Sequence, residues 1–591
     1  MKILLLHVDY IKFKPLKKAL RNVKELSEKE KKGGEAKEAL VIMTSVEKND
    51  GDVKGVVKKL IVDVKDVASQ IKTKNVVLYP YVHLSNTPSS PDLAVKVLDE
   101  AEKELKKVFT PKGVPSVKGD VNTEGKVVRA PFGYYKEFEM KVKGHPLSEL
   151  SREISVDTLK GTSGKGGGEV EEKYDYKQLL REISKSKLDR SKLKENDHRI
   201  IGQEMDLFSF SETAPGMAFW HNNGMIIRNE LIDFWREVHK KQGYQEVRTP
   251  QILDKRLWQI SGHWEKYKEN IFLTDYEKRQ FAVKPMNCPG GILIFKNSPK
   301  SYKDLPLKVG ELGNVHRQEL SGVLGGLFRV IQFTQDDAHI YCTEKQIEDE
   351  LINVIELVDF IYKKFNLPYR VELSTRPEKR IGSDKIWDKA EAVLEKVLKK
   401  KKIKFKINKG DGAFYGPKID FHVTDSLGRE WQCGTLQLDF AMPERFELEY
   451  VNKDNLRKMP IMLHRTVYGS LERFMGILLE HFNGRLPTWL APIQVRVLSF
   501  TDRNEKYAKE VIKKLGEKVP NLRIDADFRQ VSVPAKVKDG EIMRVPYIIV
   551  VGDKEEKEKK IAVRVRGDKK IQNFGVDEFG EKIRKEIEER K

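Results

Sequence analysis

Cysteine and long apolar runs are the features that this sequence has least of. It contains 3 cysteines among 591 residues, at positions 288, 342 and 433. An odd, sparse set cannot form a disulfide framework and is typical of a reducing compartment. No stretch approaches the ~18 consecutive apolar residues that a membrane-spanning helix needs. The apolar run 2–8 is too short for a signal peptide and predicts a first β-strand. We therefore expect a cytoplasmic protein with no membrane partner.

The charge balance is positive. Lys and Arg number 110 and Asp and Glu number 90, which gives a formal net charge of +20 at pH 7. Such an excess attracts anionic partners over a distance, and nucleic acid is the obvious one. The alternative to nucleic-acid binding is a generally charged surface, since Lys and Glu are both abundant, as in many hyperthermophile proteins.

The length predicts three to five domains, at roughly 100–200 residues each. Strand-like runs at 2–8, 39–46 and 75–84 are interspersed with helix-like segments. Residues 91–108 predict an amphipathic helix that begins at a proline. These patterns predict an α/β domain over residues 1–150.

The composition then changes. The Gly-rich run 161–169 predicts a flexible linker, and its Gly-Lys pair lacks the spacing of a phosphate-binding loop. Residues 201–490 mix long helices with apolar strands, which predicts one α+β domain with a large antiparallel sheet. Residues 491–591 read β-α-β-β-β-α and predict a separate C-terminal α/β domain.

Residues 313–341 predict two strands joined by a Gly-rich hairpin loop. In the second strand Phe333, Gln335, Asp337 and His339 recur at spacing two, so their side chains share one face. Such polar and charged groups are rarely buried without partners. The pattern favours the floor of a ligand-binding site over the alternative, a solvated face with scattered ion pairs.

Three segments resemble the signature motifs of class II aminoacyl-tRNA synthetases. They are residues 243–250 for motif 1, ending in Pro250; Arg317-x-Glu319 followed by Arg329 for motif 2; and residues 468–478 with Arg473 for motif 3. Further similar segments follow in the family's order, at 261–267, 284–291, 374–384, 413–420 and 431–440. Over residues 205–591 this series resembles the threonyl-tRNA synthetases, and with the N-terminal segments described below it resembles those of the archaeal type.

The resemblance implies an α/β and α+β multidomain fold. We expect an editing domain similar to D-aminoacyl-tRNA deacylases at 1–150 and a linker at 151–200. A class II catalytic domain with an antiparallel sheet is expected at 201–490, and an α/β anticodon-binding domain at 491–591.

The implied reaction activates threonine with ATP and transfers it to the 3′ end of threonine tRNA. Charge builds on phosphate oxygens, and the planar, permanently charged guanidinium suits them. By resemblance, Arg317 contacts the α-phosphate and the amino-acid carboxylate, and Arg329 and Arg473 hold the outer phosphates. Phe333 stacks on adenine, Glu319 binds its amino group and Gln437 lies near the ribose. Mg²⁺ accompanies ATP, and Arg317 and Arg473 are the expected catalytic arginines.

Cys288, His339 and His464 are too far apart in the sequence for a short zinc pattern. They fall, however, on the positions that bind zinc in the threonyl family. The resemblance therefore implies one Zn²⁺ per chain, with a fourth position open to substrate. Zinc could take both the amine and the hydroxyl of threonine, whereas valine has no hydroxyl to offer. Cys342 and Cys433 are interpreted as structural.

The resemblance also assigns residues to the amino acid and to the transfer step. Asp337, Gln335, Tyr415 and Gln432 match positions that hold threonine. His263 matches a family histidine implicated in relaying a proton from the terminal ribose of the tRNA, and it is the third expected catalytic residue. A hydrogen-bonded loop histidine is the alternative for this position.

Serine keeps both the amine and the hydroxyl and lacks only a methyl group, worth roughly 1–3 kcal/mol. A second, hydrolytic site is therefore expected. Residues 79–85 and 130–152 resemble the archaeal threonyl editing domain. By resemblance, the pocket that hydrolyses seryl-tRNA is lined by His83, Tyr134, Tyr135, Lys136 and Glu149. The alternative is an N-terminal domain that binds tRNA without editing.

Residues 491–591 resemble the anticodon-binding domain of the threonyl, prolyl, histidyl and glycyl enzymes. Glu555 and Arg564 match positions near its anticodon contacts, and motif 1 implies a homodimer. Two competing hypotheses are a non-catalytic RNA-binding relative and a prolyl- or seryl-tRNA synthetase. The first would be expected to lose an arginine or a zinc ligand, and the second is not expected to combine the three zinc-ligand positions.

Overall fold

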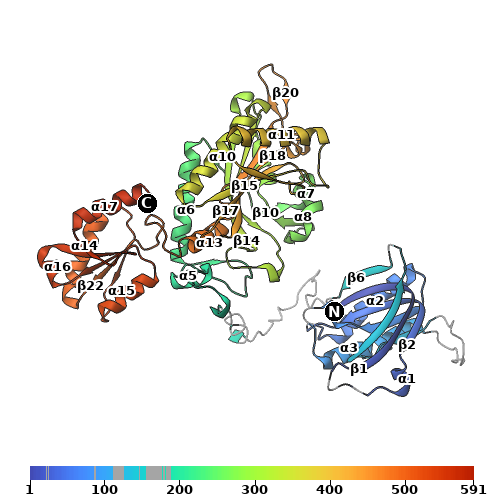
Figure 1. Ribbon diagram of the computed structural model, residues 1–591. Helices are drawn as coiled ribbons and strands as arrows, with labels where there is room; N and C mark the ends of the chain where they lie inside the picture. Colours follow the sequence, from blue (N-terminus) through green and yellow to red (C-terminus); the bar gives the residue numbers. More distant parts are fainter. Residues whose placement is uncertain are drawn as a thin grey trace, which may run out of the picture. The chain divides into compact units, whose positions relative to one another are not determined.

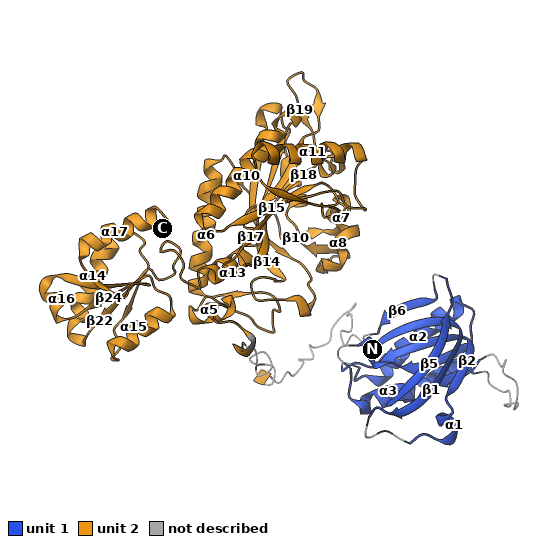
Figure 2. Ribbon diagram, viewed as in Figure 1, with its two compact units in different colours: residues 1–171 blue, residues 172–591 orange. Residues whose placement is uncertain are grey.

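The computed structural model describes the chain with the exception of residues 21, 22, 24, 49, 86, 87, 111–124, 146, 155–175, 178, 179, 181–187, 189 and 591. Most of the predicted linker at 151–200 therefore lies outside the described residues. The chain divides into two compact units, Met1–Glu171 and Glu172–Lys591 (Figure 2). We call them unit 1 and unit 2.

Unit 1 is a mixed sheet in the order β4-β3-β2-β1-β5, with β6 also paired to β1 (Figure 1). Strands β2, β3 and β4 run parallel, and helices α2 and α3 provide the crossovers that parallel pairing requires. The elements are β1 (Lys2–Lys18), α1 (Glu28–Lys31), β2 (Gly34–Ser45), α2 (Val53–Gln70), β3 (Asn75–Pro80), η1 (Val82–Leu84), α3 (Pro91–Phe109), β4 (Val127–Arg129), β5 (Tyr134–Val142) and β6 (Glu149–Glu153).

Strand alternation explains how unit 1 builds a core on each face of the sheet. Leu5 and Ile42 pack with the helices, while the adjacent residues Leu6 and Val41 join a second apolar cluster. The predicted strands and the helix 91–108 are confirmed. Two boundaries differ: β1 continues to Lys18, because it pairs with both β2 and β5, and β3 ends at Pro80, which has no backbone N–H to donate.

The larger part of unit 2 is an eight-stranded sheet in the order β16-β15-β17-β18-β21-β14-β13-β9. Pairing is antiparallel from β15 to β13 and parallel at the two edges. Helices α6, α10 and α13 contribute Phe234, Leu351 and Phe474 to its main core. The predicted antiparallel sheet with helices is confirmed.

The elements of this part are α5 (His198–Glu204), β7 (Phe208–Ser209), β8 (Phe219–Trp220), α6 (Asn222–Lys241), β9 (Gln245–Glu246), β10 (Ile252–Asp254), α7 (Lys255–Ile260), α8 (His263–Tyr267), β11 (Leu273–Tyr276), β12 (Arg279–Val283), α9 (Cys288–Lys296), β13 (Leu307–His316), β14 (Gln332–Cys342), α10 (Ile347–Lys364), β15 (Tyr369–Ser374), α11 (Asp384–Lys400), β16 (Phe405–Asn408), β17 (Lys418–Thr424), β18 (Glu430–Asp439), α12 (Ala441–Arg445), β19 (Tyr450–Val451), β20 (Arg457–Lys458), β21 (Ile461–Thr466) and α13 (Leu471–His481). Strands β13 and β14 form the predicted hairpin.

The C-terminal part of unit 2 is a five-stranded sheet in the order β23-β22-β24-β25-β26. Its elements are β22 (Val495–Ser499), α14 (Glu505–Lys518), β23 (Ile524–Asp527), α15 (Val533–Ile542), β24 (Tyr547–Val551), α16 (Asp553–Glu558), β25 (Lys560–Val565), β26 (Ile571–Gly575) and α17 (Val576–Glu588).

The predicted order of this part, with four strands and two helices, omitted one of the five strands and helices α15 and α16. Helix α15 lacks a clear apolar repeat because one of its buried positions is a lysine, Lys536, whose ammonium donates to the carbonyl of Ser499 at 3.1 Å. Helix α16 spans only six residues. Across the residues that the structure describes, each helix is too short or too polar to cross a membrane.

Candidate active sites

Three side chains far apart in the sequence meet beside a pocket of about 510 Å³ in unit 2. The ligand atoms of Cys288, His339 and His464 lie within 4.8 Å of one another, and all three residues are buried. The β14–β21 pairing sets His339 opposite His464, and Cys288 is the first residue of α9. The three expected zinc ligands are thus brought together.

The environment of this cluster fits a metal ion. His464 Nε2 lies 2.8 Å from Asp439 Oδ2, and a carboxylate partner of this kind orients the other ring nitrogen towards a cation. His339 Nε2 is buried without a hydrogen-bond partner among the described residues; Asp337 Oδ1 is 3.7 Å away.

Burial sets the charge states in the cluster. It lowers the pKa of His339 well below its usual value, which keeps the ring neutral. Burial, assisted by Asp337, raises the pKa of the Cys288 thiol. A bound cation would offset the cost of burying a charged sulfur and would favour the thiolate of Cys288. One sulfur and two imidazole nitrogens are a donor set that suits zinc.

Strand β14 forms the floor of the pocket, as its alternation predicted. Gln335 and Asp337 line the pocket. Burial raises the pKa of Asp337 to about 7, and the Asn287 amide donates to Asp337 Oδ2 at 3.4 Å. A cationic ligand such as an ammonium group would stabilise the ionised carboxylate.

The two candidate glutamines lie at different places in the pocket. Gln437 is opposite His464 in the β18–β21 pairing and accepts a hydrogen bond from the Tyr415 hydroxyl at 2.7 Å. The backbone carbonyl of Gln432 accepts from Arg473 Nη1 at 3.3 Å, while its side-chain amide donates to Asp420 Oδ1 at 2.6 Å. Gln437 and Tyr415 therefore lie at the metal end, and the backbone of Gln432 lies beside Arg473.

Three arginines form a cationic cluster. Arg317 donates to the Pro285 carbonyl at 3.1 Å, and its guanidinium lies 5.2 Å from the centre of the Phe333 ring. Burial, together with the charges of Arg329 and Arg317, lowers the pKa of Arg473. Mutually repelling cations of this kind form a site for a polyanion.

One carboxylate accompanies these arginines. Glu319 accepts a hydrogen bond from Arg329 Nε at 3.0 Å. Among the expected ATP-site residues, Arg317 contacts Phe333 and Arg329 pairs with Glu319, and the charges of Arg317, Arg329 and Glu319 act on Arg473. Gln437 lies at the metal end of the pocket.

His263 is fully buried at the start of α8. Its Nδ1 lies 2.8 Å from Ser261 Oγ, and burial lowers its pKa to about 3. Its Nε2 has no hydrogen-bond partner in the part of the chain that the structure describes. The ring packs edge-on against Phe414, a residue of the pocket wall, at 5.6 Å between ring centres.

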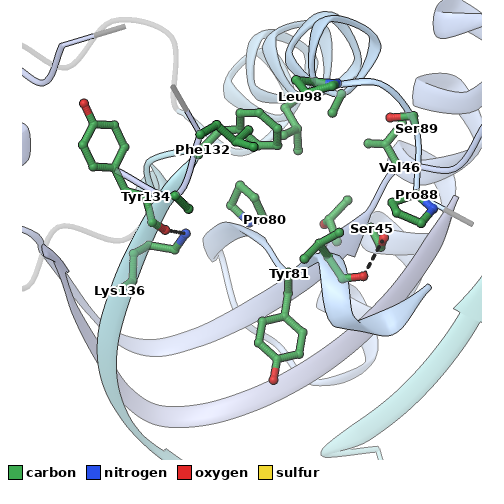
Figure 3. A pocket seen from close by; sticks show the side chains of 17 residues that line it. Ser45, Val46, Pro80, Tyr81, Pro88, Ser89, Leu98, Phe132, Tyr134 and Lys136 are labelled. Atoms are coloured by element: carbon green, nitrogen blue, oxygen red, sulfur yellow. Dashed lines mark hydrogen bonds between the residues drawn. The ribbon is translucent and has the colours of Figure 1, made fainter. Parts of the chain in front are cut away.

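Unit 1 contains its own pocket, of about 270 Å³ (Figure 3). Its wall is largely apolar and includes Pro80 and Phe132, and its charged group is Lys136. The Lys136 ammonium donates to the carbonyls of Pro131 at 3.0 Å and Tyr134 at 3.1 Å. Burial lowers the pKa of Lys136 to about 8.

The structure brings only two of the five expected editing residues into this pocket, Tyr134 and Lys136. Tyr135 is 56% exposed and alternates with them along β5. Glu149 is exposed on β6, opposite Leu6. His83 is exposed on η1, with its ring 5.4 Å from that of Tyr81. Of the described residues that form the wall, Tyr81 and Phe132 had not been expected, because apolar residues scattered along the chain give no signal of their own.

The two expected anticodon residues lie apart. Arg564 lines a pocket of about 310 Å³ together with Arg485, Arg544 and Arg566. Glu555 lies on α16, where its carboxylate accepts from the Gly552 backbone N–H at 3.0 Å and so caps the helix.

Comparison with known protein families agrees with this architecture. Residues 267–482 match the family described as "tRNA synthetase class II core domain (G, H, P, S and T)". Residues 494–586 match "Anticodon binding domain", and residues 1–154 match "Archaea-specific editing domain of threonyl-tRNA synthetase". The antiparallel sheet and its cationic pocket are therefore those of a class II aminoacyl-tRNA synthetase.

The similar curated proteins are threonine–tRNA ligases. The threonine–tRNA ligase of Caldanaerobacter subterraneus subsp. tengcongensis is 50% identical over 450 residues, which are 75% of this chain and 69% of that protein. The chain belongs to the threonyl-tRNA synthetase family. The threonine–tRNA ligase of Desulforamulus reducens is 54% identical over 67% of this chain, and the chain spans 62% of the length of that relative.

A solved structure supports the same assignment. The RNA binding domain of threonyl-tRNA synthetase from Cryptosporidium parvum Iowa II superposes with a TM-score of 0.63 at 39% identity. The match covers 65% of this chain and 97% of that structure.

Proposed function

We propose that the chain is a threonine–tRNA ligase that activates threonine with ATP and transfers it to the 3′ end of threonine tRNA. The supporting observation is a pocket that contains Arg317 and lies beside a buried Cys-His-His cluster, with Arg317 and Arg329 near enough for their charges to act on Arg473. Strand β14 connects the two ends. Phe333 contacts an arginine, and His339, six residues further on, belongs to the cluster, a span of about 20 Å at ~3.3 Å per residue.

The arginines are proposed to bind ATP, which enters with Mg²⁺. Arg317 would contact the α-phosphate and the threonine carboxylate, and Arg329 and Arg473 the outer phosphates. Their fixed positive charge stabilises the negative charge that develops as pyrophosphate leaves. Phe333 would stack on adenine and Glu319 would accept from its amino group. In this proposal Arg317 and Arg473 are the catalytic arginines.

The Cys-His-His cluster is proposed to hold one Zn²⁺ per chain. When bound, zinc would supply a Lewis-acid position that takes the amine and the hydroxyl of threonine. Asp337 and Gln335 would hold the amine, since both line the pocket close to the metal end. His263 would take part in transfer to the terminal ribose.

The geometry favours an exchange of roles between the two glutamines. Gln437, bonded to Tyr415 beside the metal cluster, suits a contact to threonine. Gln432 also lines the pocket, and its backbone carbonyl bonds Arg473, which suits a contact to the ribose of ATP. This exchange reverses the two assignments that the sequence motifs implied.

We further propose that unit 1 hydrolyses seryl-tRNA. Its pocket of about 270 Å³, which contains a largely buried ammonium, favours a chemical role over simple tRNA binding. Lys136 and Tyr134 are the residues that the pocket supports. The other three expected residues lie outside the pocket on exposed surface: His83, Tyr135 and Glu149. In this proposal they act when bound tRNA covers that surface and closes the site.

The remaining assignments follow from the family. Residues 1–150, 201–490 and 491–591 are proposed as the editing, catalytic and anticodon-binding domains, joined at 151–200 by the linker. Arg564 and Glu555 would contact the anticodon of threonine tRNA. We propose a homodimer formed through motif 1, and a cytoplasmic location.

ATP–pyrophosphate exchange with threonine, serine, valine and proline in parallel tests the main proposal. Threonine should support strong exchange, serine weaker exchange, and valine and proline none. Strong exchange with proline and none with threonine would overturn it.

A further inference from the structure

His198, which belongs to none of the sequence motifs, is buried at the start of α5 and uses both ring nitrogens. Its Nε2 accepts a hydrogen bond from the Leu327 backbone N–H at 2.9 Å. Its Nδ1 therefore carries the proton and donates to Glu480 Oε1 at 2.6 Å. Although Asp197, His198 and Glu480 are close enough to one another for a metal, the imidazole has no lone pair left for one. The contact must have another role.

Leu327 belongs to the tight turn 325–329 at the end of the motif 2 loop. The turn is closed by a hydrogen bond from the Gly325 N–H to the Arg329 carbonyl at 3.1 Å. It carries Arg329, and the Phe328 carbonyl accepts from Arg473 Nε at 2.9 Å. Two of the three proposed phosphate-binding arginines therefore depend on where this backbone lies.

The His198 ring packs closely against the turn 325–329. The His198 ring centre is 4.3 Å from that of Phe328. Gly326 has a φ of +54°, and a Cβ at this position would lie 2.2 Å from His198 Nε2. Only glycine permits both this backbone conformation and this approach of the imidazole.

Glu480 attaches the same imidazole to motif 3. It lies on α13, the helix that carries Arg473, and also accepts from the His198 backbone N–H at 3.0 Å. Its second oxygen pairs with Arg429, whose guanidinium lies 5.4 Å from the centre of the Phe328 ring. The motif 2 turn and the motif 3 helix are thus linked to each other through His198.

We propose that His198 is a positioning residue of the ATP site: it links the turn 325–329 to Glu480 and so places Arg329 and Arg473 for the phosphates. The inference rests on the proposed ligase function. It assigns to His198, a residue outside the signature motifs, a role in ATP binding and none in threonine binding.

The test is His198→Ala in the full chain, assayed by threonine-dependent ATP–pyrophosphate exchange. The KM for ATP should rise on the order of tenfold, because the buried Leu327 N–H loses its acceptor. The KM for threonine should stay within about twofold, because the metal end of the pocket is unchanged. His221→Ala is the matched control, since that ring contacts Asp206 and Ser209 instead; it should leave both constants unchanged.

Gly326→Ala probes the same contact from the loop side. In the natural chain the new methyl group would push His198 away, and the KM for ATP should rise. In the His198→Ala background the same substitution should have a much smaller effect, because the imidazole no longer occupies that space. Additive effects would show that the two residues do not act through their contact.

An unchanged KM for ATP in His198→Ala would overturn the inference, as would an equal rise in both KM values. If the natural chain shows no threonine-dependent exchange, the proposed function fails instead. Calorimetric titration with Mg·ATP then still decides the inference: equal affinities of the natural chain and His198→Ala would refute it, and an affinity loss on the order of tenfold would support it.

Discussion

Replacing Lys136 by methionine should make unit 1 more stable while impairing its proposed reaction. The ammonium is largely buried in an apolar pocket, where desolvation lowers its pKa from 10.5 to about 8. One pKa unit corresponds to about 1.4 kcal/mol, so the buried charge costs the fold up to roughly 3 kcal/mol at neutral pH. Allowing for the part of the side chain that water still reaches, we expect about 2 kcal/mol. Methionine keeps most of the volume and removes this cost.

The pH dependence provides an independent check. Between pH 8 and 10.5 the unfolded chain holds the proton that the folded chain has lost, so the stability of the natural protein rises with pH in this window. The advantage of Lys136→Met should therefore be complete below pH 8. It should fall to less than half by pH 9.5, as the folded-state amine becomes neutral.

The stability assay must report on unit 1, and all 7 tryptophans lie beyond residue 219. A suitable method is a urea titration of the full chain in which a brief protease pulse digests unfolded unit 1 and the surviving band is quantified. A Lys136→Met chain that is no more stable at pH 7, or whose advantage persists unchanged at pH 9.5, would refute the burial argument.

The same variant tests the chemistry. Deacylation of preformed seryl-tRNA should slow by on the order of 10²–10³-fold, the typical effect of losing one preorganised electrostatic contact. Threonine activation should be unchanged, because Lys136 and the arginine cluster lie in different units. A natural rate of deacylation would show that the lysine has no part in editing.

Three further predictions concern unit 2. His339→Ala should reduce bound zinc, measured by elemental analysis of protein purified without added metal, from about one per chain to nearly none, whereas Cys433→Ala should retain it; a metal-free natural protein with full threonine activation would exclude the zinc site. Gln437→Ala should raise the KM for threonine and Gln432→Ala the KM for ATP, on the order of tenfold each for the loss of a polar contact, and the opposite pattern in pyrophosphate exchange would restore the motif-based roles. Light scattering at micromolar concentration should give twice the 68.3 kDa of one chain, and a monomer would contradict the proposed dimer.

The glutamines show where sequence reasoning reaches its limit. Gln437 is five positions after Gln432, and in a regular strand an odd spacing puts two side chains on opposite faces. Both nevertheless line the pocket, because the β17–β18 pairing shifts register at Cys433, which has no partner in the ladder. That bulge depends on the neighbouring strand, and nothing in the local sequence indicates it.

For the editing residues, the sequence already contained the pattern that the structure follows. Alternation along β5 separates Tyr135 from Tyr134 and Lys136, and the period of two was already visible in the sequence. The motif resemblance treated the three as one group, and strand geometry was the better guide to which of them line the described pocket.

The sequence by itself determined the fold class, the β13–β14 hairpin and the polar face of β14, because strand alternation and turn chemistry depend on neighbouring residues alone. Its motifs also indicated the family. Only the tertiary structure decided which end of the pocket each glutamine faces, which editing residues share a cavity, and that His198 links motif 2 to motif 3. Those relations join segments that are distant in the chain, so they depend on the register between strands and on the packing of helices against the sheet.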